Sequence, residues 1–354
     1  MTRSRDTANT QDNIGGAVPP FVAGKNKIIN GDFSVNQRAF TSTTTSATYG
    51  YDRFYLLANN GTSTMSAQTF TPGTAPVAGY EAANYVNVQS TGQTATNALT
   101  VLIQAIEDVR TLANQTVTVS FWAKASSGTP KVAVELLQGF GTGGSPSASV
   151  LNYAGQATLS TSWARYSVTV ALPSISGKTL GTTANTSALY LNLWTSAGSD
   201  YNSRTGSIGI QTTTISFWGV QVEAGSVATP FQTATGTIQG ELAACQRYYY
   251  RFTYGGANSN NICTGTGVST TRTFQYLPTP VSMRTAPSLA YGGTPTVGDT
   301  ATNTSVTNIL YYSSTADNTQ HTIDCRVASG ITQFRPYFIV LTTAGQYIEL
   351  SSEF

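Results

Sequence analysis

The sequence is poor in charge and in cysteine, and both shortages exclude classes of function. Charged residues make up 10% of the 354, whereas about a quarter is usual in soluble domains. The formal net charge is +2 and no run of five basic residues occurs, so we expect no nucleic-acid partner. Cys245, Cys263 and Cys325 are widely spaced. This spacing indicates neither a disulfide framework nor a zinc site, and we expect buried, reduced thiols.

Long apolar runs are also missing. No stretch approaches the roughly 18 apolar residues that a membrane helix needs, so we expect no membrane insertion. The first residues, MTRSRDTANTQDNIGG, lack the apolar core of a signal peptide. We therefore expect a chain that is made in the cytosol and stays there until release.

No familiar catalytic pattern is present either. The chain has no nucleophile elbow, HExxH motif, Walker loop or GxGxxG followed by a helix. Its one histidine, His321, lies in a polar turn near Asp324, which is a weak hint of acid-base chemistry. We expect a surface histidine. Two carboxylates distant in sequence can still meet as in a glycosidase, but the only local acidic pair is Glu107 and Asp108. We expect neither an enzyme nor a cofactor.

What the sequence does contain is a repeated strand pattern. Apolar residues make up 40% of the chain, with 19 Tyr and 14 Phe, enough to bury a core. Apolar and polar residues alternate in TVTVSFWAKA (116–125), KVAVELLQ (131–138), SWARYSVTVALP (162–173), ALYLNLWTS (188–196) and TTISFWGVQVEAG (213–225). Alternation at hairpin spacing is typical of an antiparallel sandwich.

Helical patterns are scarce. A short turn is predicted around 106–112 and a helix in TIQGELAACQRYY, which follows a segment of linker composition after Pro230. We place a domain boundary there. The predicted fold is all-β, with a short extended N-terminal arm (1–25), a jelly-roll β-sandwich (26–235) and a second, smaller β-sandwich domain (236–354).

An ordered set of blocks resembles a known family. The blocks are NKIINGDFSVNQRAF, YGYDRFYLL, LANQTVTVSFWAKASSG, STSWARYSVTV, FWGVQVEAGSVATPFQ and ELAACQRYYYRF, within residues 26–250. Together they resemble bacteriophage tail fibre and receptor-binding virion proteins, whose first region is similar to a carbohydrate-binding-module-like jelly roll. The opening TRSRDTANTQDNIGG resembles arms that anchor fibres to the particle.

This resemblance implies a homotrimer in the virion that residues 1–25 attach to other virion proteins and that binds host-surface polysaccharide. We expect recognition on the jelly roll or on the C-terminal domain, which would form a receptor-facing tip. Attachment to the tail or to the capsid stays open. A purely structural capsid fibre or decoration protein without a ligand is the alternative, and a polysaccharide depolymerase is the third.

Large aromatic residues occupy the polar side of two predicted strands. Trp122, Tyr190 and Trp194 take this position, with Asn192 between the last two. Aromatic rings stack on the C–H faces of sugars and an amide supplies directional hydrogen bonds, so these four residues are the candidate glycan-binding set. The alternative is that they pack beneath a loop or against another subunit.

Three acidic residues lie at block edges that resemble those where carbohydrate modules hold a structural calcium. They are Asp32, Asp52 and Glu223. Calcium takes six to eight oxygen ligands, and three scattered carboxylates are a weak basis for such a site. Asp32 after Gly31 also fits a turn, and in that interpretation Ile28, Ile29 and Phe33 fix the first strand to the core.

Overall fold

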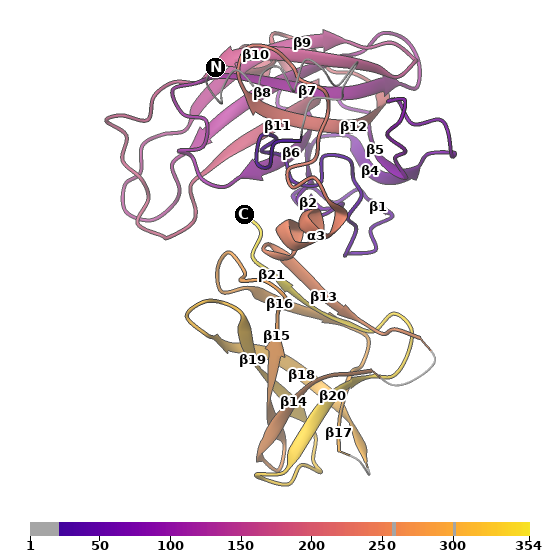
Figure 1. Ribbon diagram of the computed structural model, residues 1–354, viewed down its shortest axis with the longest axis vertical. Coiled ribbons are helices and arrows are strands. Elements are labelled where there is room, and N and C mark those ends of the chain that lie inside the picture. The colour runs from indigo at the N-terminus through magenta and orange to yellow at the C-terminus, as the bar shows by residue number, and fades with distance from the viewer. Residues whose placement is uncertain (1–20, 257–259, 300–301) are drawn as a thin grey trace, which may run out of the picture.

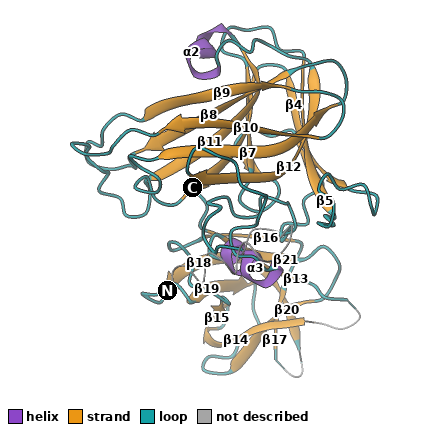
Figure 2. Ribbon diagram, turned by 45° about the horizontal axis from the view of Figure 1, so that its top comes forward, coloured by secondary structure: helices purple, strands orange, loops and turns teal. Residues whose placement is uncertain are grey.

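The computed structural model describes residues 21–256, 260–299 and 302–354, and β-strands dominate this part of the chain (Figures 1 and 2). Most of the predicted arm, residues 1–20, lies outside the described residues. Residues 21–25 run beside residues 232–236, where the Gly24 N–H donates to Ala234 O (2.9 Å). No helix in the described part of the chain has the length and apolar character needed to cross a membrane.

Two six-stranded antiparallel sheets form the upper body in Figure 1. In order across the first sheet, the strands are β1 (Ser42–Thr43), β4 (Thr62–Thr69), β5 (Asn84–Thr91), β12 (Thr213–Ala224), β7 (Thr116–Ala125) and β10 (Ala164–Ala171). Across the second sheet they are β2 (Thr48–Tyr49), β3 (Tyr55–Asn59), β6 (Leu99–Ile106), β11 (Ala188–Ala197), β8 (Lys131–Gly139) and β9 (Val150–Thr158).

Alternation along each strand decides which side chains enter the core between the two sheets. The inward positions of β7, β8 and β11 are fully buried, as predicted: Val117, Val119, Phe121, Ala123, Val132, Val134, Leu136, Leu189, Leu191 and Leu193. Ile28 and Phe33 join the same core, and Phe33 packs on Phe54 with ring centroids 4.9 Å apart. Phe33 and Asn30 both have positive φ, so this entry segment is a run of tight turns. The β-sandwich expected for this region is confirmed.

A short helix links this sandwich to the rest of the chain. It is α3 (Ile238–Gln246), the helix that the sequence predicted. Thr237 is its N-cap, and the Thr237 hydroxyl accepts from the Gly240 N–H at 3.1 Å. In Figure 1 it lies between the two bodies of the molecule. The other helical segments described, η1 (Ser199–Tyr201) and α2 (Asn202–Thr205), lie at the edge of the sandwich beside β9 (Figure 2).

The remaining strands form a three-stranded sheet and a closed barrel, where the sequence predicted a smaller sandwich. The sheet holds β13 (Tyr249–Thr253), β21 (Tyr347–Ser351) and β16 (Ser288–Gly292). In order around the barrel, the strands are β14 (Asn260–Ser269), β15 (Arg272–Pro278), β19 (Gln320–Val327), β18 (Asn303–Ser314), β17 (Thr296–Gly298) and β20 (Pro336–Leu341). The barrel has its own apolar core. Apolar and polar residues alternate along the strands of a sandwich and of a barrel alike, so the sequence pattern could not distinguish the two folds.

Two expectations about single residues have different outcomes. The three cysteines are free and buried, as predicted. His321, however, is fully buried instead of lying at the surface. Its Nδ1 lies 3.2 Å from the Tyr311 hydroxyl and its Nε2 lies 3.4 Å from the Thr279 hydroxyl. Two hydroxyl partners explain why a polar ring is tolerated at this depth.

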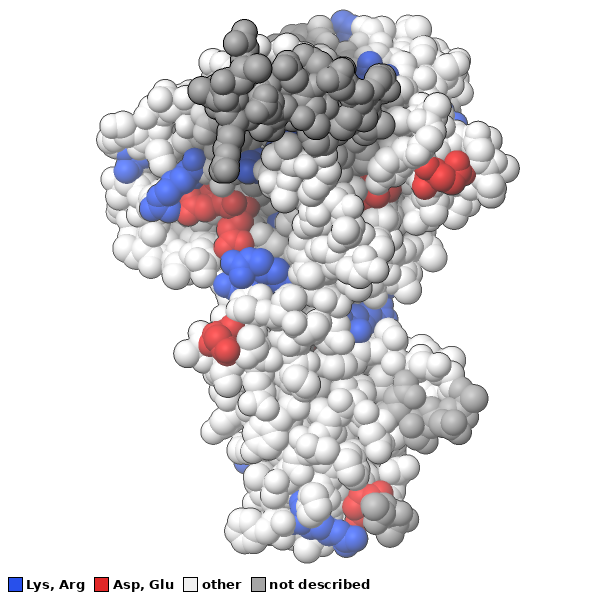
Figure 3. Space-filling view, viewed as in Figure 1, with Lys and Arg blue, Asp and Glu red and all other residues white. Residues whose placement is uncertain are grey.

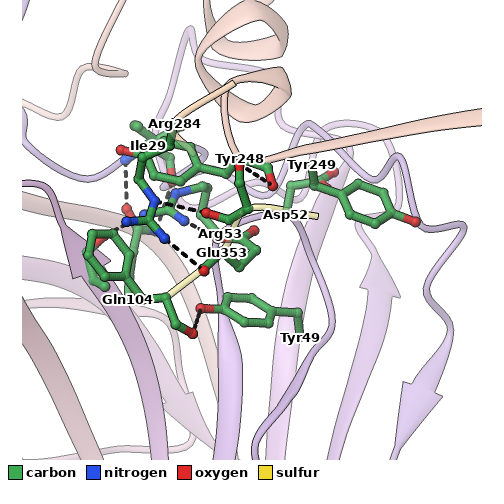
Figure 4. Close-up of polar contacts among 12 residues, drawn as sticks. Ile29, Tyr49, Asp52, Arg53, Gln104, Tyr248, Tyr249, Arg284 and Glu353 are labelled. Carbon is green, nitrogen blue, oxygen red and sulfur yellow. Dashed lines mark hydrogen bonds and ion pairs between the residues drawn. The ribbon is translucent and has the colours of Figure 1, made fainter. Parts of the chain in front are cut away.

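A network of buried arginines connects the sandwich to the three-stranded sheet (Figure 4). Arg53, which is 1% exposed, pairs with Glu353 and donates to Ala105 O at 2.5 Å. Its guanidinium lies 3.4 Å from the centre of the Tyr248 ring. Arg38 pairs with both Glu353 (3.2 Å) and Asp52 (2.7 Å). Most of the face in Figure 3 carries neither acidic nor basic groups.

Candidate ligand-binding face

The outer face of the second sheet carries an apolar cluster that is separate from the core. Outward side chains of neighbouring strands form it together with residues after β11: Tyr55, Leu57, Leu99, Val101, Ile103, Ala133, Tyr190, Trp194, Ala197, Tyr201 and Ile208. An outward face of a sandwich strand is normally polar. A contiguous apolar patch there is typical of a binding surface or a subunit contact.

The strand register brings three of the four predicted site residues onto this face. In β11, Tyr190 stands opposite Ala105 and Leu137, and Trp194 stands opposite Val101 and Ala133. Asn192 lies between them, opposite Ile103 and Glu135. Since successive residues of a strand point to opposite faces, all three side chains point away from the core.

A helical turn after β11 returns two more side chains to this face. The turn comprises η1 and α2 and ends at Gly206, which has a positive φ. It carries Tyr201, whose ring centroid is 5.2 Å from that of Trp194, and Arg204, whose guanidinium lies 4.8 Å from the centre of the same indole. The face therefore has an aromatic wall on one side.

A buried carboxylate organises the polar groups of the face. Glu135 has no exposed surface, and its oxygens accept two hydrogen bonds from Arg204, both at 2.8 Å. The Asn192 amide donates to Glu135 at 2.8 Å and the Trp194 indole N–H at 3.3 Å. One charge thus fixes the rotamers of three side chains, which pre-organises the surface.

These residues enclose an open hollow of about 420 Å³, within the size range of small-molecule sites. Asn192 lines it and is 3% exposed, and its Oδ1 is buried and has no hydrogen-bond partner among the described residues. Buried polar atoms are normally paired. The hydroxyls of Tyr55, Tyr190 and Tyr201 make no hydrogen bond with the described residues, and burial raises the pKa of Tyr55 and Tyr190. The Tyr55 and Tyr190 hydroxyls therefore stay protonated and able both to donate and to accept.

The large aromatic residues of the hollow differ in accessibility. Trp194 is 2% exposed and lies beneath Arg204, so it forms the floor. The rings of Tyr55, Tyr190 and Tyr201 are half-buried and line the opening. A flat ligand that enters the hollow therefore meets tyrosines first.

Trp122, the fourth predicted site residue, lies elsewhere. It belongs to β7 of the first sheet, where it stands opposite Trp218 of β12. Its indole N–H is buried and has no hydrogen-bond partner within the described ranges of the chain. Trp122 and the other three candidates therefore belong to different sheets. Alternation within a strand predicts which way a side chain faces but not the sheet to which the strand belongs.

The three calcium candidates each bind different protein groups. Asp32 accepts from the Ser34 hydroxyl and the Tyr80 hydroxyl, both at 2.9 Å, which is the turn alternative. Asp52 pairs with Arg38, while Glu223 accepts from Gln221 and Thr229. Protein donors satisfy each carboxylate, and the described residues contain no group of three or more His, Cys, Asp or Glu that could hold a metal. The calcium site is not supported.

Sequence reasoning missed Glu135, Tyr55, Tyr201 and Arg204. Glu135 gave a usable signal, because it is a lone acid on the outward side of an apolar strand, KVAVELLQ. Such a residue in a β-strand needs a cationic partner. Tyr201 and Arg204 gave none, since only the turn after β11 brings them back to the sheet.

Comparisons with known proteins find a likeness in shape only. No family model matches the chain, and no curated protein matches it. Among solved structures, one neighbour is a family 11 carbohydrate-binding module from Clostridium thermocellum in complex with a β-1,3-1,4-mixed-linked tetrasaccharide (10% identity, TM-score 0.32, 54% of this chain and 99% of that chain). Another is the CBM22-2 xylan-binding domain of Xyn10C from Paenibacillus barcinonensis (15% identity, TM-score 0.30, 48% and 91%). At these scores we draw no function from them.

Proposed function

We propose that this chain is a non-catalytic structural protein of a bacteriophage particle that recognises host-surface glycan through the outer face of its second sheet. The observation that supports the binding role is the hollow beside β11, where tyrosine rings surround a buried Asn192 oxygen that has no partner in the described part of the chain. The virion assignment is supported by the resemblance of the ordered sequence blocks to tail fibre and receptor-binding proteins.

Binding follows from the chemistry of the lining. A pyranose ring presents a C–H face that packs on the exposed tyrosine rings and hydroxyls that pair with the Tyr190 and Tyr201 hydroxyls. A sugar hydroxyl donates to Asn192 Oδ1, which removes the cost of an unpaired buried acceptor. Affinity per site is modest in such an open hollow. In a homotrimer, simultaneous binding to one polysaccharide raises the avidity without any new contact.

A glycan array tests the binding role. We expect the purified oligomer to bind at least one bacterial surface polysaccharide, and Tyr190→Ala and Tyr201→Ala to weaken that binding about tenfold or more. Tyr312→Ala is the matched control, because Tyr312 is 60% exposed on the barrel. If only Tyr312→Ala lost binding, the glycan site would lie on the C-terminal domain instead. Absence of binding to any polysaccharide would refute the role.

One observation favours a different candidate function. Trp194 is almost wholly buried and Arg204 lies over it, as in a packing surface. In a purely structural capsid fibre or decoration protein, a second copy of the chain would cover the hollow. Tyr190→Ala would then break the oligomer, as sedimentation would detect, and would have no separate effect on glycan.

The anchoring role of residues 1–25 is tested by truncation. Removal of residues 2–20 should leave a folded oligomer that is missing from assembled particles. Normal incorporation of the truncated protein would contradict the anchor. The site of the labelled protein on the particle distinguishes tail from capsid attachment.

A further inference from the structure

The outer face of the first sheet carries a second hollow, on the opposite side of the sandwich from the first. It measures about 250 Å³. Its lining residues are Thr69, Phe70, Thr71, Thr74, Tyr85, Lys124 and Trp163. None of them belongs to the glycan site proposed above.

Three elements build this hollow. Lys124 of β7 and Tyr85 of β5 both stand on the outward side of the first sheet, since their neighbours Ala123 and Val86 are buried in the core. Trp163 directly precedes β10, which pairs with β7. Thr71 and Thr74 come from the loop between β4 and β5.

The rings form a compact aromatic wall. The centroid of Trp163 lies 5.4 Å from that of Tyr85, with the planes at 89°, and 5.5 Å from that of Phe70. Phe70 and Tyr85 lie 4.7 Å apart. Phe70 is buried, whereas Trp163 and Tyr85 are half-buried and stay accessible from the hollow.

Lys124 brings a positive charge to this wall. Its ammonium lies 5.2 Å from the centre of the Trp163 ring and 5.8 Å from that of Tyr85, so cation–π contacts hold it in place. Among the described residues, no carboxylate oxygen lies within 4.0 Å of the Lys124 ammonium, so Lys124 forms no ion pair with them. Arg204 in the first hollow differs, because Glu135 neutralises it.

The remaining lining is hydroxylic. Thr69, Thr71 and Thr74 are exposed at the rim. The Thr74 hydroxyl donates to Thr71 O at 2.6 Å, which leaves its oxygen free to accept. The hollow thus combines an aromatic wall, hydroxyl groups and the Lys124 ammonium, which has no ion-pair partner among the residues that the structure describes. Its volume is below the roughly 300–1,000 Å³ of sites for drug-sized ligands.

We propose that this hollow is a second carbohydrate site, specific for a sugar residue that carries a carboxylate, such as a hexuronic acid. The apolar face of the sugar packs against Trp163 and Tyr85, its carboxylate pairs with the Lys124 ammonium, and its hydroxyls bond to the threonines. A neutral sugar makes the ring packing and the threonine hydrogen bonds but not the ion pair with Lys124.

The test compares two oligosaccharides that differ only at C6. Tri-galacturonate and galactotriose, both α-1,4-linked, are titrated calorimetrically into the full-length protein at low and high salt. We expect tri-galacturonate to bind at least tenfold more tightly, and the difference to shrink in 0.5 M NaCl because salt screens the ion pair. Lys124→Met keeps the apolar stem and should remove the preference, whereas Lys124→Arg should retain it.

Lys131→Met is the matched control, since it removes the same charge from β8 of the other sheet. Its preference for the acidic ligand should equal that of the wild type. Equal affinity for both ligands, no binding of either, or an equal loss in both Met variants would overturn the proposal. Tyr190→Ala should leave tri-galacturonate binding at the second hollow unchanged, so failure of the first site is distinguishable from failure of this one.

Discussion

At the scale of single residues, His321 shows how burial converts a polar side chain into a pH-sensitive element of the barrel. Its ring is fully buried between the Tyr311 and Thr279 hydroxyls. Burial lowers the pKa of His321 below its ordinary value, an effect that the charge of Asp317 opposes. The folded barrel therefore holds a neutral imidazole.

The sign of the pH dependence follows. Below about pH 6.5 the unfolded chain binds a proton at this histidine that the folded chain resists. The free energy of unfolding therefore falls as the pH drops below 6.5, by up to about 1.4 kcal/mol per pH unit from this group. His321→Gln retains hydrogen-bonding capacity but does not titrate.

Urea unfolding of wild type and His321→Gln at pH 7.5 and pH 5.5 measures this contribution. We expect the variant to be less stable at pH 7.5 by about 1 kcal/mol, the value of a typical hydrogen bond, and the gap to narrow at pH 5.5. A gap that is constant with pH would show that His321 titrates equally in both states.

At the scale of elements, the barrel depends on close strand contacts that only glycine permits. A Cβ on Gly265 of β14 would lie 1.8 Å from Phe274 O of β15, and one on Gly267 would lie 2.3 Å from Thr332 O. These are backbone atoms, which cannot move aside as a flexible side chain can. Small side chains at such points let a six-stranded barrel close.

Gly265→Ala should therefore destabilise the barrel by at least about 2 kcal/mol, in the range of overpacked cores. Thr264→Ala, at the neighbouring exposed position of the same strand, should have little effect. All four tryptophans lie in the sandwich part of the sequence. We thus expect circular dichroism to detect early unfolding in Gly265→Ala while the tryptophan fluorescence midpoint stays the same. Equal shifts by both probes would contradict a local effect.

The elements also show what the sequence could and could not predict. Alternation correctly gave five strands of the sandwich, β7, β8, β10, β11 and β12. It also gave the inward residues of β7, β8 and β11 and the outward positions of Tyr190, Asn192 and Trp194. It could not place Trp122, because strands that follow one another in the sequence, such as β7 and β8, can belong to different sheets, and the partner of each strand depends on contacts across the whole sandwich. For the same reason it missed Tyr201 and Arg204, which a turn returns to the sheet, and the closure of the barrel.

At the scale of the whole molecule, the joint between the sandwich and the three-stranded sheet depends on a few buried charges (Figure 4). Glu353 pairs with both Arg53 and Arg38. Arg284 reinforces the joint by donating to Ser352 O and Glu353 O, both at 2.8 Å, and its guanidinium lies 3.9 Å from the centre of the Phe354 ring. The segment after β21 is thus enclosed by arginines from both bodies.

Glu353→Ala should weaken this joint more than either body, because it leaves the buried Arg53 guanidinium without its counter-charge. Loss of one partner of a buried ion pair costs about 3–5 kcal/mol. We expect the variant to unfold in two separated transitions, one detected by the sandwich tryptophans and one by circular dichroism of the remaining strands. In the wild type, the midpoints of these two transitions should lie closer together. Glu349→Ala is the control, since its partners Tyr249 and Arg251 belong to the same three-stranded sheet. Coincident transitions in Glu353→Ala would show that packing around Tyr248 and α3, rather than the ion pairs, couples the two bodies.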